Sequence, residues 1–118
     1  MRYADVLLMA AEALNENGKS TQALPFLNAV RARARGENDS LLPDITTTDQ
    51  LALRDIIFTE RSRELAFEGL RFWDIIRANR ANEILGPLGF QEGSMNYFPF
   101  PLTEIDNSNG AIEQNPGY

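Results

Sequence analysis

The sequence contains no cysteine and no histidine. The missing thiols exclude disulfides, thiolate catalysis and zinc–thiolate sites. The missing imidazoles remove the commonest general base, the usual partner of a catalytic serine and the usual ligand of transition metals. Few enzyme mechanisms remain open to a chain that lacks both side chains. We therefore expect a protein that is not an enzyme, with no catalytic residue, no metal site and no cofactor.

Long apolar runs and an excess of basic residues are also missing. No stretch approaches the roughly 18 apolar residues that a membrane-spanning helix needs. Lys and Arg number 11 against 17 Asp and Glu, which gives a net charge of −6 at pH 7. An acidic chain whose cations alternate with acids is poorly suited to a polyanion, so we expect no nucleic-acid partner. The length of 118 residues predicts a single domain over 1–118.

Residues 47–77 carry the longest helical pattern of the chain. Thr47, followed three residues later by Gln50, predicts a capping box at the start of this helix. Gly69 predicts its end, because glycine readily adopts the left-handed conformation after a last turn. A second short helix over 70–77 follows, which the pattern allows to continue as far as residue 85. The apolar residues of the long helix form two stripes, one of Leu53, Ile56, Ile57 and Phe67 and one of Leu51, Phe58 and Leu65.

Two carboxylates, Glu60 and Glu64, fall inside the first apolar stripe, so both are predicted to be partly buried. A buried carboxylate is unstable unless it is paired, and the planar guanidinium of arginine suits this role. The candidate partners are Arg2, Arg31, Arg33, Arg61, Arg63 and Arg71.

A glycosidase is the alternative interpretation of the two glutamates. That reaction needs carboxyl groups about 5 to 9.5 Å apart across a substrate-sized gap. Two residues one turn apart on a packed helix enclose no such gap, so we favour a structural role. Carboxylate metal bundles use a Glu-x-x-His motif, which a chain without histidine lacks.

Two further helices are predicted before this one. The pattern of residues 2–17 leaves only a narrow polar side, and residues 21–35 follow after a short gap that forces an antiparallel hairpin. The first helix has its polar side at Asp5, Glu12 and Glu16 and its apolar positions at Ala4, Val6, Leu7, Leu8, Ala10, Ala11, Ala13 and Leu14. The second is predicted to be capped by Ser20 or Thr21 and buried through Ala23, Leu24, Leu27, Val30 and Ala34. The alternation of small and large residues is typical of a tetratricopeptide repeat, although a generic helical hairpin is also compatible with it.

The remaining segments are predicted to be less regular. Residues 36–45 form a loop by composition, and Gly86 with Pro87 ends the helical part. Pro99 and Pro101 hold residues 97–101 extended, as an ordered strap, and Thr103 can cap one further turn. Trp73 is assigned to the core, with a sugar-stacking platform with Tyr97, Phe98 and Phe100 as the alternative. Asp55, Glu68 and Asp74 are expected to form a solvated charge lattice. The predicted class is all-α: a tetratricopeptide-like hairpin packed on a long central helix, with an irregular Pro/Gly-rich C-terminal strap.

Residues 60–74, Glu-Arg-Ser-Arg-Glu-Leu-Ala-Phe-Glu-Gly-Leu-Arg-Phe-Trp-Asp, resemble the C-terminal region of the SusD/RagB family of Bacteroidetes outer-membrane lipoproteins. Residues 2–16 and 27–34 look like the helical pair that precedes that block in the family. Residues 97–106 resemble its Pro-x-Pro strap, and 114–118 are similar to its usual chain end. Leu70 departs from the pattern, since histidine is common there. Without a signal peptide or a lipidated cysteine, the chain is expected to be a C-terminal helical fragment of a larger SusD-like protein.

The resemblance implies a carrier and not an enzyme. Such a protein is exposed at the outer-membrane surface, captures glycans or other nutrients and works with a TonB-dependent transporter that imports them. Sugar-contacting residues of the family mostly lie outside this region, so no ligand-binding residue is assigned and the ligand is expected to bind through an N-terminal portion. The resemblance assigns a structural ion-pair network to Glu60, Arg61, Glu64, Glu68, Arg71 and Asp74. The alternative is a stand-alone helical repeat adaptor that binds a protein or peptide. An uncovered apolar first helix also predicts self-association.

Overall fold

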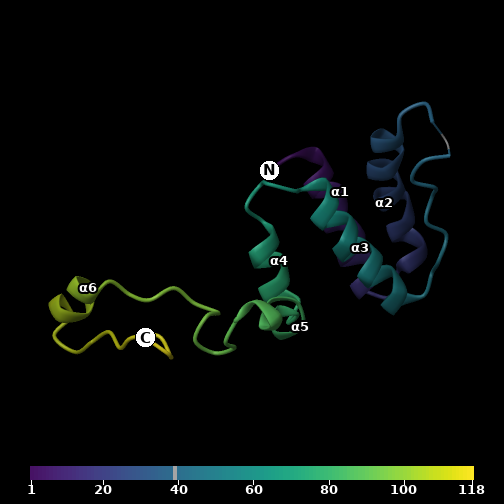
Figure 1. Ribbon diagram of the computed structural model, residues 1–118. Coiled ribbons are helices and arrows are strands. Elements are labelled where there is room, and N and C mark those ends of the chain that lie inside the picture. The colour runs from purple at the N-terminus through teal and green to yellow at the C-terminus, as the bar shows by residue number, and fades with distance from the viewer. Residues whose placement is uncertain (39) are drawn as a thin grey trace. The chain divides into compact units, whose positions relative to one another are not determined.

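The computed structural model describes residues 1–38 and 40–118, so residue 39 of the predicted loop lies outside the described residues. Within these ranges all regular structure is helical (Figure 1), which confirms the predicted fold class. The elements are α1 (Tyr3–Glu16), α2 (Ser20–Arg35), α3 (Gln50–Glu64), α4 (Arg71–Arg77), α5 (Ala81–Leu85), a short 3₁₀ helix (Gly86–Leu88) and α6 (Leu102–Asn107). The chain divides into two compact units, residues 1–71 and 72–118. The single domain over 1–118 stays a prediction.

The first unit is an α1–α2 hairpin packed on α3 (Figure 1). Its core is built from alternating small and large side chains, all of them buried: Ala4, Leu8, Ala11, Ala23, Leu27, Val30, Leu53 and Ile57. Ala11 and Ala23 are fully buried, and their small size lets the backbones of α1 and α2 approach closely. Leu8 and Leu27 fill the neighbouring level. The tetratricopeptide-like spacing therefore predicts the packing correctly.

A polar cluster ties together three helix ends in this unit. Asn15, at the end of α1, is fully buried. Its Oδ1 accepts a hydrogen bond from the Ser20 hydroxyl (2.8 Å) and its Nδ2 donates to the Gln50 carbonyl (2.9 Å). Gln50 Nε2 in turn donates to the Asn15 carbonyl (2.7 Å). The predicted cap from Ser20 or Thr21 is wrong, because both residues lie inside α2, and Lys19 precedes the helix without a side-chain cap.

The long central helix is shorter at both ends than its pattern predicts. Asp49, and not Thr47, caps α3, since its Oδ1 accepts a hydrogen bond from Ala52 N (2.7 Å). The helix ends at Glu64, five residues before Gly69. Phe67 then adopts a positive φ of 65° and lies fully exposed, so the apolar stripe does not reach it. Leu51 and Ala34 are exposed as well, so the predicted apolar faces are not covered at these positions.

The second unit contains short helices and the C-terminal strap. Asn79 adopts a left-handed φ of 54° between α4 and α5, so the helix over 70–77 does not continue to residue 85. α6 begins at Leu102 after Pro101, without a side-chain cap from Thr103. The strap is bound by the side chain of Gln114. Its Oε1 accepts from Phe100 N (2.8 Å) and its Nε2 donates to the Phe100 carbonyl (3.0 Å).

Gly117 provides a test of how closely the chain end packs in this unit. It has a φ of +92°, and a Cβ added there would overlap the Cβ of Ser94. We expect Gly117→Ala to lower the stability of the second unit by more than the strain of about 1–3 kcal/mol that a left-handed non-glycine residue carries. Amide hydrogen exchange over residues 94–118 measures the loss.

Gly110→Ala is the matched control, since Gly110 has a φ of +85° and open space around its Cβ position. It carries the backbone strain without the collision. Equal effects of the two substitutions would show that the contact with Ser94 adds nothing.

Candidate functional site

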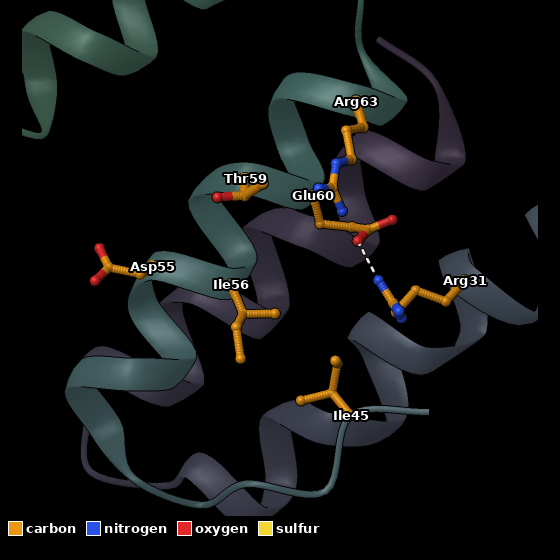
Figure 2. A pocket seen from close by; sticks show the side chains of 7 residues that line it. All are labelled: Arg31, Ile45, Asp55, Ile56, Thr59, Glu60 and Arg63. Carbon is orange, nitrogen blue, oxygen red and sulfur yellow. Dashed lines mark hydrogen bonds and ion pairs between the residues drawn. The ribbon is translucent and has the colours of Figure 1, made fainter. Parts of the chain in front are cut away.

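The most buried charges of the first unit are Arg31 on α2 and Glu60 on α3. Arg31 Nη1 lies 2.5 Å from Glu60 Oε2, and the two side chains are only 7% and 5% exposed. The Nε and Nη2 of Arg31 donate to the Pro43 carbonyl at 3.1 and 3.0 Å. Figure 2 shows the pair reaching across the space between the two helices. A single guanidinium thus neutralises a buried carboxylate and holds the following loop.

Glu64 lies one turn further along α3, and its side chain is 8% exposed. Its carboxylate is shared by Arg2 Nη1 (2.8 Å) and Arg33 Nη2 (2.5 Å). Arg2 also donates to Glu68 Oε1 and to the Glu64 carbonyl. These bonds to Glu68 and Glu64 raise the pKa of Arg2, and the bond from Arg2 lowers the pKa of Glu68. The residue before α1 is therefore bound to the end of α3.

A third buried pair joins α1 to α3. Arg61 Nη1 lies 3.0 Å from Asp5 Oδ1, and both residues are buried. The prediction that Asp5 lies on the polar side of α1 is wrong, because α3 covers that side at this level. Since Arg61 neutralises it there, Asp5 is a charged member of the core that the helical pattern alone does not reveal.

Arg71 and Asp74 differ from the other residues of the predicted network. The Arg71 guanidinium lies 4.1 Å from the centre of the Phe58 ring and donates to the Phe58 carbonyl (3.3 Å). Asp74 is buried and pairs with Arg77, whose Nη2 lies 2.8 Å from Asp74 Oδ1. The expectation that Asp74 is solvated is therefore wrong. Glu68 and Asp55 are more exposed, as expected for a surface lattice.

A hollow of about 310 Å³ opens beside the Arg31–Glu60 pair (Figure 2). It is lined by Arg31, Ile45, Asp55, Ile56, Thr59, Glu60 and Arg63. Glu64 does not line it, so the two glutamates of the glycosidase interpretation do not face each other across this space. Glu60 itself is bonded to Arg31. Glu60 and Glu64 are therefore not placed on opposite sides of this hollow, as the glycosidase interpretation requires.

A second hollow of about 360 Å³ lies between the start of α1 and α2. Its lining is mostly apolar and consists of Arg2, Tyr3, Ala4, Leu7, Ala29, Val30 and Arg33. Both of its arginines already bind Glu64. Over residues 1–38 and 40–118, no group of acidic side chains is arranged to hold a metal ion. The same ranges contain no helix that is both long and apolar enough to cross a bilayer.

These features define a class: a helical, tetratricopeptide-like module whose buried carboxylates are neutralised by arginines from neighbouring helices. The family model of the SusD family matches residues 1–91. The chain belongs to the SusD family.

The relatives agree with this assignment over the whole chain. Two SusD-like proteins of Formosa agariphila are 41% and 37% identical to it, over 100% and 99% of this chain but only 25% and 24% of their own length. A SusD homolog from Bacteroides thetaiotaomicron has a TM-score of 0.80 at 32% identity, covering all of this chain and 26% of that one. Surface glycan-binding protein A from the same species has a TM-score of 0.75 at 34% identity over 98% of this chain and 24% of its own. The chain thus spans about a quarter of its relatives' length.

The buried pair predicts a strong effect of Glu60→Ala on stability. Removing the carboxylate leaves the Arg31 charge buried, which costs about 3–5 kcal/mol. Glu64→Ala should be milder, because Arg2 and Arg33 are 41% and 60% exposed and can regain water. Chemical denaturation measures both losses.

Two controls accompany this comparison. The double variant Arg31→Met/Glu60→Leu leaves no unpaired charge and should lose less stability than Glu60→Ala alone. Glu83→Ala removes the exposed partner of Arg80 and should leave the midpoint unchanged. An unchanged midpoint for Glu60→Ala would refute the importance of the buried pair.

Acidification should destabilise the fold through paired surface carboxylates. Hydrogen bonds from Arg54 and from Arg2 lower the pKa of Glu16 and of Glu68 below the ordinary value of 4.5. Because the pKa of each of these carboxyl groups is lower in the folded chain than in the unfolded chain, both groups stabilise the fold at pH values above 4.5. This stabilisation is lost as the pH falls through the lowered pKa. The free energy of unfolding should therefore decline below pH 4.5, and more gently in Glu16→Gln/Glu68→Gln.

Urea unfolding at a series of pH values on either side of 4.5 measures this slope. Glu37→Gln, in the exposed loop after α2, is the control and should follow the parent chain. The explanation fails if the double variant keeps the full slope.

Proposed function

We propose that this chain is a scaffold part of a surface glycan- or nutrient-binding lipoprotein of the outer membrane, which works with a TonB-dependent transporter. The observation that carries the proposal is the match to the SusD family over residues 1–91. A structural relative named as a surface glycan-binding protein supports the ligand class. In this role the whole protein binds a nutrient without altering it, this chain supports the fold, and we propose no enzymatic activity.

The ion pairs support the scaffold role within that function. Glu60, Glu64, Glu68 and Arg61 have oppositely charged partners on α2, on α1 or just before α1, and most of these groups are removed from solvent. The carboxylate oxygens of Glu60 and Glu64 are bonded to arginines, so they are already engaged in holding neighbouring helices. We therefore assign Glu60, Arg61, Glu64 and Glu68 to holding the helices of the first unit together. Arg71, which contacts Phe58, and Asp74, which pairs with Arg77 inside α4, complete the proposed structural network. A longer part of such a protein, corresponding to the rest of the relatives' length, would carry the main ligand contacts.

The partnership with a transporter has a direct test. The protein, purified with an affinity tag from native outer membranes under mild detergent, should bring down a TonB-dependent transporter in near-equal amount. Quantitative mass spectrometry measures that ratio, and an unrelated outer-membrane lipoprotein carrying the same tag is the control. Recovery in the soluble fraction with a peptide or protein ligand, and without a transporter, would favour the helical adaptor instead.

The absence of turnover is tested separately. Incubation with oligosaccharides, followed by chromatography of the products, should show no cleavage by the parent chain. If cleavage did occur and Glu60→Gln abolished it while the fold was kept, the scaffold role would be replaced by a glycosidase.

A further inference from the structure

Three aromatic residues of the second unit, Phe72, Trp73 and Phe98, form a cluster that takes no part in the ion pairs described above. Trp73 on α4 was predicted to lie in the core, yet it is 50% exposed. Its indole makes edge-to-face contacts with Phe72 (ring centres 5.2 Å apart, 76° between planes) and with Phe98 of the strap (6.1 Å, 63°). Such contacts fix the orientation of a ring without stacking another ring flat on it. The indole is therefore held in place and still accessible.

The strap that supplies Phe98 is itself held rigidly. Pro99 and Pro101 restrict its backbone, and the chain end bonds to its carbonyl groups. Asn115 Nδ2 donates to the Phe98 carbonyl (2.6 Å), and the Tyr118 hydroxyl donates to the Tyr97 carbonyl (3.1 Å). Together with the Gln114–Phe100 bonds, these contacts fix the backbone that carries Tyr97, Phe98 and Phe100. A site organised in advance loses less entropy on binding.

The polar groups around the cluster narrow the class of ligand. The carbonyls of Tyr97, Phe98 and Phe100 already accept hydrogen bonds, and Phe100 N already donates one, so the strap is a poor edge for an added peptide strand. The indole N–H of Trp73 donates to no acceptor in residues 1–38 and 40–118. What remains is the half-exposed indole ring of Trp73, a flat apolar group with one hydrogen-bond donor at its edge. A pyranose ring, with an apolar C–H face and hydroxyls around its rim, has the complementary form.

We propose that Trp73, with Phe98 beside it, is a stacking site for a pyranose ring of a neutral oligosaccharide. In this site the indole N–H donates to a hydroxyl of the sugar. This inference rests on the proposed glycan-binding function and adds a sugar contact within residues 72–118, which the family resemblance did not assign.

Trp73 is the only tryptophan of the chain, so its fluorescence reports on this site alone. The 118-residue chain is titrated with cellohexaose and with maltohexaose, which differ in the geometry of their linkages. We expect at least one sugar to shift the indole emission and to protect it from acrylamide quenching. Calorimetry of the same mixture should give the same dissociation constant as the fluorescence.

Variants then test which side chains form the site. Phe98→Ala keeps the fluorophore and should weaken binding at least tenfold. Trp73→Phe keeps a ring in the cluster but loses the indole N–H and part of the flat surface, and calorimetry should show a similar loss. Phe67→Ala is the matched control, since Phe67 is a fully exposed aromatic of the first unit, and its affinity should equal that of the parent. Circular dichroism verifies that each variant keeps its helices.

Each contrary result has a distinct meaning. Heat of binding without any change in indole emission would place the sugar elsewhere, which overturns this site but leaves the proposed function intact. The absence of both signals with both sugars overturns the site as well, while the transporter test decides the proposed function independently. An emission change that depends on protein concentration alone would show that a second copy covers the cluster, and this also overturns the proposal.

Discussion

The pairing of guanidinium and carboxylate across the helices of the first unit is the constraint on which the other contacts depend. A charge removed from water is stable only beside an opposite charge at close range, so Glu60 fixes where Arg31 must lie and Arg61 fixes Asp5. Apolar packing alone tolerates small slips of one helix along another. The 2.5 Å contact between the buried Arg31 and Glu60 side chains does not tolerate such a slip. Sliding one helix along another would separate these charges while they stay buried, which is strongly unfavourable.

The sequence predicts this arrangement only in part. Glu60 and Glu64 are identified because they interrupt an apolar stripe, and the physical need for a partner then indicates arginine. The particular partner is not predictable from periodicity, since Arg31 and Arg2 belong to segments far away in the sequence. Asp5 and Asn15 are missed for a related reason. Each occupies a position that looks solvent-facing on its own helix and becomes buried only when another element covers it.

Helix ends and aromatic exposure were the other limits of sequence reasoning. Thr47 and Asp49 are both competent caps, and only the path of the incoming loop decides between them. Phe67 continues the apolar repeat of the helical pattern. The helix ends at Glu64, however, and the Phe67 side chain is exposed. Trp73 has apolar neighbours in the sequence, which suggested burial. Its side chain is nevertheless half exposed, and it contacts Phe72 and Phe98 by the edge-to-face geometry that the apolar pattern does not predict.

Side chains of α2 bind the loop between α2 and α3 at residues 42–45, and this indicates where the loop tolerates an insertion. Asn28 binds both backbone groups of Ile45, Arg31 holds the Pro43 carbonyl and Arg35 holds that of Leu42, so all of these anchors act on its second half. The entropy of closing a loop grows only slowly with length. Extra residues introduced ahead of Leu42 would leave the anchored half in place. This is where an epitope, a spin label or a fluorescent protein can be inserted with the least disturbance to the hairpin.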